Sequence, residues 1–195
     1  MSEQIKATYI DHMGSDLSVV NAARVSFGKK AEFEGRVGGP NVLSKRDTNL
    51  VRYLAKHKHT SPFGHAYAKF HVKAPIFVAR QLVKHKFLRW NEISRRYVDD
   101  EPEFYVPDVW RGRSEDKKQG SEGEVKLRTL DAAIISDSPY DALSAYKAAL
   151  NSGVAPEQAR MVLPQSTMTE WIWSGSLDAF ADMCNLRLKT DTQYE

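Results

Sequence analysis

The segment from residue 84 to residue 97 carries the side chains best suited to chemistry in this sequence. It combines five cations with aromatic, amide, carboxyl and hydroxyl groups, in the order Lys84-His85-Lys86-Phe87-Leu88-Arg89-Trp90-Asn91-Glu92-Ile93-Ser94-Arg95-Arg96-Tyr97. Arginine and lysine bind phosphate groups, arginine in a bidentate way, and aromatic rings can stack on a base. The segment therefore fits a nucleotide pocket or a surface for a nucleic-acid strand, although a solvated basic helix end has the same composition.

Three other groups of side chains give weaker signals. Ser94 is a nucleophile by type, but no base stands at a defined place beside it, so we expect it to donate a hydrogen bond to a nucleotide. Cys184, the only cysteine, stands among apolar residues and is typical of a small buried hydrophobe. The histidines between residues 57 and 71 match none of the known zinc spacings, so we predict no metal site.

The composition fits a single globular domain. The chain has 195 residues, of which 42% are hydrophobic and 27% charged, and a net charge of +3 that does not by itself indicate nucleic-acid binding. The N-terminal residues hold no signal-peptide core, and no apolar run approaches the roughly 20 residues that span a bilayer. With a lone cysteine that forms no intrachain disulfide, we expect a cytoplasmic protein (in the host cytoplasm if viral) with no membrane partner.

The elements that must position the basic segment are mostly helices. Helical spacing and capping signals predict helices over residues 17–27, 44–57, 75–86, 138–153, 156–163 and 176–188. Alternation predicts a half-buried strand over 67–73, and 103–106 is a weaker candidate. Charged stretches that contain glycines, at 28–41 and 110–124, are predicted to be mobile loops. No linker divides residues 1–195, so we expect one α+β domain.

The basic segment also resembles the signature of the flavin-dependent thymidylate synthases. That family carries Arg-His-Arg, seven residues and then Ser, with an ending Asn-Glu-x-Ser-x-Arg-Tyr. Here Lys84-His85-Lys86 is followed after seven residues by Ser94, and residues 91–97 fit the ending. Both flanking arginines are lysines, which keeps the charge but replaces a planar fork by a point charge.

Five further blocks resemble the family in the same order along the chain. They are residues 22–27, 59–65, 70–81, 159–164 and 185–187. The resemblance implies the family's fold, a single α+β domain with a small, mostly antiparallel sheet flanked by helices. It implies catalysis of the reductive methylation of dUMP to dTMP, with FAD as cofactor, NADPH as reductant and 5,10-methylenetetrahydrofolate as the carbon donor.

The resemblance also assigns roles to individual residues. Arg187 is the implied catalytic residue, because it would lie against the pyrimidine and favour ionisation of its ring nitrogen. The implied dUMP-binding residues are Gln81, Leu82, Val83, Lys84, Glu92, Ile93, Ser94, Arg95, Arg96, Arg160 and Arg187. The implied FAD-binding residues are Ser26, Ser61, Lys84, His85, Lys86, Asn91, Glu92, Ser176, Leu177, Asp178 and Asp182.

Some residues depart from the family pattern. Asp178 stands where relatives often have a cation, and Asp191 where a histidine is common. The sequence after Arg187 lacks the family's further C-terminal helix, which we expect to be dispensable or replaced by a neighbouring subunit. The resemblance implies a homotetramer with active sites shared between subunits, dUMP and folate as partners, and no nucleic acid. A flavoprotein with lost or weakened synthase activity and a single-stranded nucleic-acid-binding protein are the alternatives.

Overall fold

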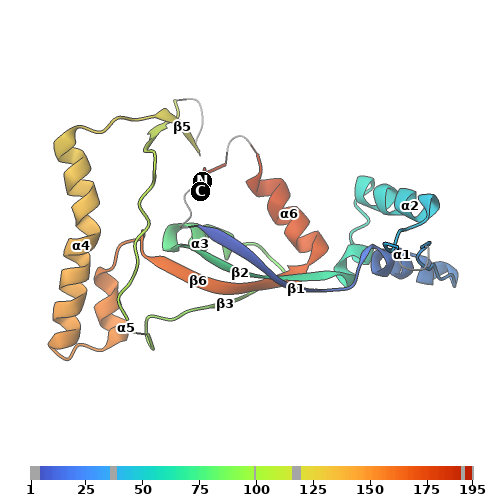
Figure 1. Cartoon of the computed structure of the whole chain (residues 1–195), viewed down its shortest axis with the longest axis horizontal. Coiled ribbons are helices and arrows are strands. Elements are labelled where there is room, and N and C mark those ends of the chain that lie inside the picture. Colours follow the sequence, from blue (N-terminus) through green and yellow to red (C-terminus); the bar gives the residue numbers. More distant parts are fainter. Residues whose placement is uncertain (1–4, 36–38, 99, 116–119, 190–191, 195) are drawn as a thin grey trace.

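The centre of the molecule is a four-stranded antiparallel sheet with the strand order β1-β2-β6-β3. The computed structural model describes residues 5–35, 39–98, 100–115, 120–189 and 192–194. Within them, the sheet strands are β1 (Lys6–Met13), β2 (Tyr67–Pro75), β3 (Leu88–Glu92) and β6 (Met168–Ser176). Figure 1 shows the sheet in the middle of an elongated molecule, with helices at both ends. The expected α+β class with a small antiparallel sheet is confirmed.

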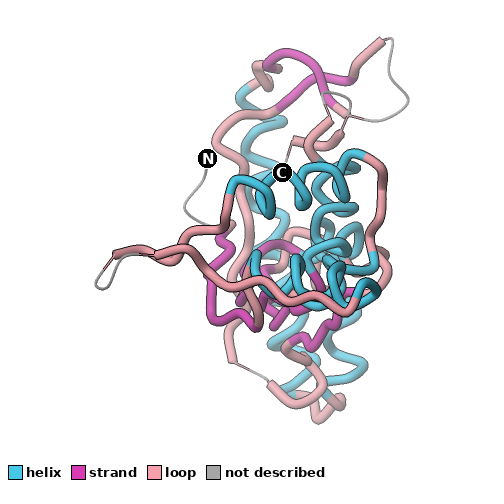
Figure 2. The backbone as a smooth tube through the Cα atoms, turned by 90° about the vertical axis from the view of Figure 1, so that its right-hand side faces the viewer, coloured by secondary structure: helices cyan, strands magenta, loops and turns pink. Residues whose placement is uncertain are grey.

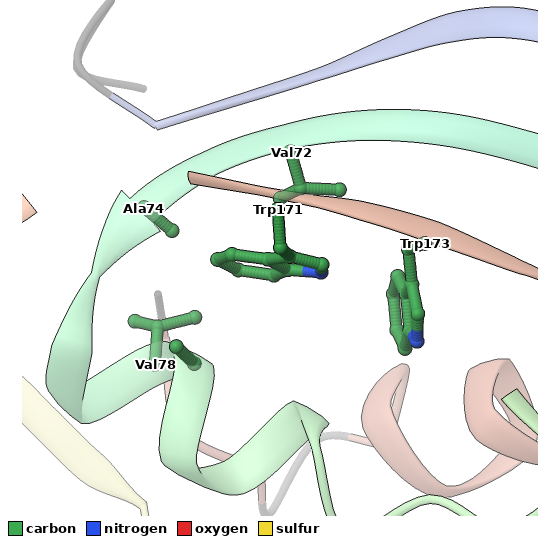
Figure 3. Packing of buried hydrophobic residues seen from close by; sticks show 6 residues of the cluster. Val72, Ala74, Val78, Trp171 and Trp173 are labelled. Carbon is green, nitrogen blue, oxygen red and sulfur yellow. The ribbon is translucent and has the colours of Figure 1, made fainter. Parts of the chain in front are cut away.

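One face of the sheet is apolar because alternate residues of β2 and β6 point to the same side. Val72, Trp171 and Trp173 are buried there with Val78 from α3 (Ile76–Leu82), as Figure 3 shows. Trp90 of β3 stacks on Trp171 with ring centroids 4.2 Å apart. Helix α6 (Leu177–Arg187) packs against the same cluster through Phe180 and Met183. Strand β3 therefore holds the middle of the basic segment, residues 88–92, in the sheet.

A helical lobe lies at one end of the sheet, in front in the view of Figure 2. It contains α1 (Asp16–Arg24), the 3-10 turn η1 (Val25–Phe27), α2 (Lys45–Lys56) and the 3-10 turn η2 (Ser61–His65). Val19, Leu54 and Ala66 form its core. Ser44 accepts a hydrogen bond from the Asp47 amide and so caps α2, as its sequence position predicts. A buried ion pair between Arg24 and Asp47 joins the two helices.

The other end of the molecule is built on α4 (Thr129–Asn151), and here the helix prediction was wrong. Residues 138–153 were expected to form a helix that Ser138 caps, but α4 begins nine residues earlier and runs through Pro139. Pro139 has no N–H to donate to the Ile135 carbonyl. The Ser138 hydroxyl donates to that carbonyl instead, at 3.0 Å. The helix therefore tolerates a proline that was interpreted as its start.

Other expected boundaries also need correction. Helix α3 begins at Ile76 and ends at Leu82 rather than running from 75 to 86, because Pro75 completes β2 and residues 83–87 form a turn. Residues 103–106 form only an isolated bridge, from Phe104 to Thr167. The expected helix at 156–163 is a short α5 (Pro156–Ala159) followed by the 3-10 turn η3 (Arg160–Val162).

Four strands were not anticipated. The loop predicted at 110–124 contains a hairpin of β4 (Arg111–Arg113) and β5 (Ser121–Glu124), although residues 116–119 lie outside the description. Strand β1 is exposed along its whole length and shows no clean alternation. Strand β6 was also missed, although its run of Trp171, Ile172 and Trp173 is typical of a strand. The other predicted mobile loop, residues 28–41, includes residues 36–38, which lie outside the description. The mobility of that loop stays a prediction.

Candidate functional site

Arg187, at the end of α6, meets the end of α3 and the turn that follows it. Its Nε donates to Nε2 of His85 at 2.9 Å. Its two terminal nitrogens donate to the side-chain and backbone carbonyls of Gln81, both at 3.2 Å. These three residues, which the resemblance assigns to catalysis, dUMP binding and FAD binding, therefore form one cluster. Arg187 is more than a hundred positions away from the other two in the sequence.

Electrostatics keep the imidazole of this cluster neutral. Burial, and then the positive charge of Arg187, lower the pKa of His85 below its usual range. A neutral imidazole can accept the hydrogen bond from the guanidinium, whereas an imidazolium cannot. The arrangement therefore holds Arg187 in place through neutral acceptors. None of these three hydrogen bonds goes to a carboxylate that would neutralise the guanidinium charge.

A second group of predicted residues lines a pocket of about 460 Å³ on another side of α3. Ser94, Arg96 and Arg160 contribute polar groups, and Arg96 Nε donates to Ser94 Oγ at 3.1 Å. Other lining residues that the resemblance had singled out are Val83, Glu92 and Ile93. Arg80 also lines this hollow, so three arginines and a hydroxyl face it with one carboxylate, that of Glu92. This excess of positive charge is well suited to an anion such as a phosphate.

The carboxylate of Glu92 forms part of this second pocket and is held from two directions. It accepts hydrogen bonds from Trp90 Nε1 at 3.0 Å and from Thr169 Oγ1 at 2.6 Å. Because neighbouring strand residues point to opposite faces, Asn91 lies on the other side of the sheet from Glu92. The adjacent Asn91 and Glu92 therefore cannot reach the same face of one ligand from this strand.

Helix α3 separates the first cluster from the second pocket. Gln81, together with His85 in the turn beyond the helix, faces Arg187, whereas Arg80 and Val83 line the second pocket. Arg80 was not among the predicted site residues, although its spacing from Lys84 placed both on one helical face. The sequence grouped Gln81, Val83 and Arg187 around dUMP and assigned His85 to FAD. A single copy of the chain presents the dUMP-binding residues in two places.

A third hollow, of about 640 Å³, lies between α2, η2 and α6. Its walls are largely apolar, with Phe63 and Leu177 among the lining residues, and Asp178 and Asp182 add carboxylates. The buried Oδ1 of Asp178 has no hydrogen-bond partner in the described structure. A buried acceptor without a partner is costly, so this oxygen fits a ligand that brings an N–H or O–H group.

The remaining predicted residues lie outside these three places. Arg95 donates to the backbone carbonyl of Asp100 at 2.6 Å and lines none of the three. Leu82 packs in the core, and Ser176 is buried at the end of β6. Ser26 lies in η1 and Ser61 begins η2, while Lys84 and Lys86 are exposed in the turn after α3. Asp191 lies outside the described residues.

A profile of the family described as "Thymidylate synthase complementing protein" matches residues 8–195. The chain belongs to this family. Among its relatives, the flavin-dependent thymidylate synthase of Thermosipho melanesiensis is 39% identical over 188 residues, which cover 95% of this chain and 78% of the relative. The flavin-dependent thymidylate synthase of Thermus thermophilus is 42% identical over 186 residues and 95% of this chain, which spans 65% of the length of that relative.

Solved structures agree with the family assignment. A UMP/dUMP methylase, PolB from Streptomyces cacaoi bound with 5-Br dUMP, superposes with a TM-score of 0.80 at 32% identity, over 94% of this chain and 78% of that one. The same methylase bound with 5-Br UMP superposes with a TM-score of 0.74. The thymidylate synthase complementing protein fold, expected from five short blocks of sequence, is therefore confirmed across the chain.

Two further observations concern membrane-spanning helices and metal sites in this chain. No helix in the described residues is long and apolar enough to cross a membrane. The described part of the chain also holds no group of three or more histidine, cysteine, aspartate or glutamate side chains arranged to bind a metal ion.

Proposed function

We propose that this chain is a flavin-dependent thymidylate synthase that methylates dUMP to dTMP. The proposal rests on the meeting of Arg187, Gln81 and His85, because three separate blocks of the family pattern converge there. The names of the Thermosipho and Thermus relatives and the dUMP analogue in the Streptomyces methylase support the same activity. In this proposal FAD is the cofactor, NADPH the reductant, and methylenetetrahydrofolate the source of the carbon.

Arg187 is the proposed catalytic residue. A guanidinium beside a pyrimidine stabilises negative charge that develops on the ring, and a preorganised charge does so with little rearrangement. Gln81 and the neutral His85 fix the guanidinium through three hydrogen bonds. Arg96, Arg160 and Ser94 are the proposed ligands of the nucleotide phosphate, since they surround a hollow suited to an anion.

The residues present fit a flavin in part. The hollow between α2, η2 and α6 has apolar walls for a ring and an unpartnered Asp178 oxygen for a ring N–H. Asp178 and Asp182 would repel a phosphate, so the exposed Lys84 and Lys86 are better candidates for the cofactor's phosphates. When bound, the flavin would supply the transfer of reducing equivalents, and the protein would supply binding and orientation.

The separation of Arg187 from the anion pocket by α3 supports a shared site. One dUMP would take its base contact from one subunit and its phosphate contacts from another, as in the proposed homotetramer. Helix α4 also exposes Leu130 by 72% and Ile134 by 60%, one turn apart on the same side. Apolar side chains exposed in this way are typical of a surface that another subunit covers.

The decisive experiment is an assay of dTMP formation in which dUMP, methylenetetrahydrofolate, FAD and NADPH are omitted in turn. We expect turnover only with all four present. Bound flavin with no turnover under any condition would instead indicate a flavoprotein that has lost synthase activity. A protein that binds no flavin but retains single-stranded nucleic acid would favour the nucleic-acid interpretation. Cytoplasmic localisation stays a prediction.

A further inference from the structure

Gly175 of β6 stands directly across the ladder from Leu88, the first residue of β3. A Cβ atom at Gly175 would lie 2.5 Å from Leu88 Cδ2 and 3.1 Å from the Phe87 carbonyl oxygen. Carbon atoms do not approach to 2.5 Å without a displacement, because packed interiors leave few voids. With a Cβ atom at this position, the Leu88 side chain would have to turn away, and the Phe87 carbonyl would have to yield by a few tenths of an ångström.

The space above Gly175 is part of the apolar face of the sheet. Trp171, Trp173 and Gly175 alternate along β6 and so share that face, where Figure 3 shows the two indoles. Trp90 pairs with Trp173 and Leu88 pairs with Gly175. Along this face of β6, two indoles are followed by a glycine, which has no side chain. The Leu88 side chain occupies the space beside Gly175 and packs against the core cluster.

Phe87, immediately before Leu88, adopts a left-handed backbone conformation with φ of 65°. Residues other than glycine rarely adopt this conformation, and they keep it only where the surrounding structure enforces it. The Phe87 ring is 82% exposed, so its own packing does not enforce it. The backbone pairing of Leu88 with Gly175 in the ladder is the constraint that follows Phe87 along the chain.

The turn that ends at Phe87 carries Lys84, His85 and Lys86. Its start is fixed by α3, through a hydrogen bond from the His85 amide to the Leu82 carbonyl at 3.1 Å. Its end enters the sheet at Leu88, which pairs with Gly175. A displacement of Leu88 would therefore move the lysines and pull His85 away from Arg187.

We propose that Gly175 is a positioning residue for the turn of Lys84, His85 and Lys86, and acts through Leu88 and Phe87. It touches no ligand in this proposal. It determines the position at which the chain passes from the turn into β3. That position in turn determines the geometry of the His85–Arg187 contact and the placement of Lys84 and Lys86. The part that concerns cofactor binding rests on the proposed function.

The test compares four proteins: wild type, Gly175→Ala, Leu88→Ala and the double variant. The first readout is the NMR titration of His85, whose partners are Arg187 from α6 and, within the turn, the neighbouring Lys84 and Lys86. In Gly175→Ala we expect the pKa of His85 to rise towards its ordinary value, since the imidazole leaves its partly buried place beside Arg187. The double variant lacks the Leu88 methyl groups that the new Cβ would strike, and should restore the wild-type titration.

The second readout is FAD affinity, measured by titration well below the melting temperature of each variant. We expect Gly175→Ala to weaken it by about tenfold, as displaced binding groups do, and the double variant to recover it. Leu88→Ala alone should lower the melting temperature but leave both readouts unchanged. Gly35→Ala is a matched control, because the one contact of its Cβ with the described residues would be the Pro40 carbonyl at 3.5 Å.

A wild-type titration of His85 in Gly175→Ala would overturn the proposal, as would a double variant that fails to recover it. These outcomes do not depend on the flavin. If the wild type binds no FAD, the proposed function fails, but the titration of His85 still decides the role of Gly175.

Discussion

Arg187 and His85 are 102 positions apart in the sequence and are joined by a hydrogen bond of 2.9 Å. The bond ties the C-terminal end of α6 to the turn of the basic segment. It makes the protonation of His85 depend on this contact, because the nearby guanidinium is, after burial, one reason why the pKa of His85 is low.

Arg187→Ala should abolish dTMP formation while FAD remains bound, since the proposed base contact is lost. The variant should also raise the pKa of His85, because the positive charge beside the imidazole is removed while its burial remains. A turnover assay and an NMR titration measure the two effects. Arg128→Ala is the control, because Arg128 is 86% exposed and pairs only with Asp131. Turnover near the wild-type level in Arg187→Ala would disprove the assignment.

Lys84→Arg and Lys86→Arg, made together, should keep activity or tighten nucleotide binding. The change restores a planar fork where this chain has a point charge, and both side chains are exposed enough to accommodate it. Isothermal titration with FAD, whose phosphates the two lysines are proposed to bind, and with dUMP compares the variant with Lys126→Arg, a matched exchange at an exposed position away from the three pockets. A complete loss of binding would mean that the turn is shaped differently from that of its relatives.

Asp47 should make the protein sensitive to acid. Burial alone would raise the pKa of Asp47, but hydrogen bonds from Arg24 and Ser44 and the charges of Arg24 and Arg46 outweigh it and leave the pKa lowered. A carboxyl with a lowered folded pKa contributes stability above its unfolded value, about 3.9. That contribution is lost as the pH falls through the folded value.

Asp47→Asn should therefore lower the free energy of unfolding by about 2 kcal/mol at neutral pH, as the loss of hydrogen bonds to a charged group does. The difference from wild type should shrink below about pH 4. Urea unfolding at several pH values measures both. Asp137→Asn, on the exposed side of α4, should show neither effect.

The Ser138 hydroxyl should stabilise α4 only because Pro139 follows it. Ser138→Ala removes the donor to the Ile135 carbonyl and should cost about 1 kcal/mol. In a Pro139→Ala background the backbone N–H returns to serve that carbonyl, and the same change should cost nothing. A double-mutant cycle by thermal unfolding tests the coupling; equal costs in both backgrounds would refute it.

Leu130→Glu with Ile134→Glu should convert the proposed tetramer into smaller species. Both side chains are largely exposed on one face of α4, and burying two carboxylates in an interface is costly. Sedimentation at several concentrations gives the mass of each species. Ser144→Glu, at an exposed position of the same helix, is the control. A wild-type mass for the double variant would place the interface elsewhere.

Local signals predicted the parts of the fold that local physics controls. Ser44 indicated α2 because a cap is satisfied within one turn, and the alternation of residues 67–73 indicated β2 because the strand is half-buried. Strand β1 gave no such signal, since all of its residues are exposed and only its pairing with β2 orders it. Pro139 misled because the compensating hydroxyl of Ser138 cannot be seen before the helix is built.

The site was predicted as a set of residues but not as an arrangement. The family pattern named Gln81, His85 and Arg187, and the structure brings them together. The pattern did not show that α3 lies between Arg187 and the pocket of Arg96 and Arg160. The sequence does not reveal on which side of α3 each of these segments packs. The role suggested for Gly175 was equally invisible, since it depends on a distance across the sheet.

The stack of Trp90 on Trp171, with Trp173 edge-on to both, gathers three of the four tryptophans at the centre of the sheet. Indole fluorescence from this chain will thus report chiefly on one place. Because that emission overlaps the near-ultraviolet absorption band of oxidised flavins, a nearby bound flavin should quench it by energy transfer. Cofactor binding could then be followed without a label.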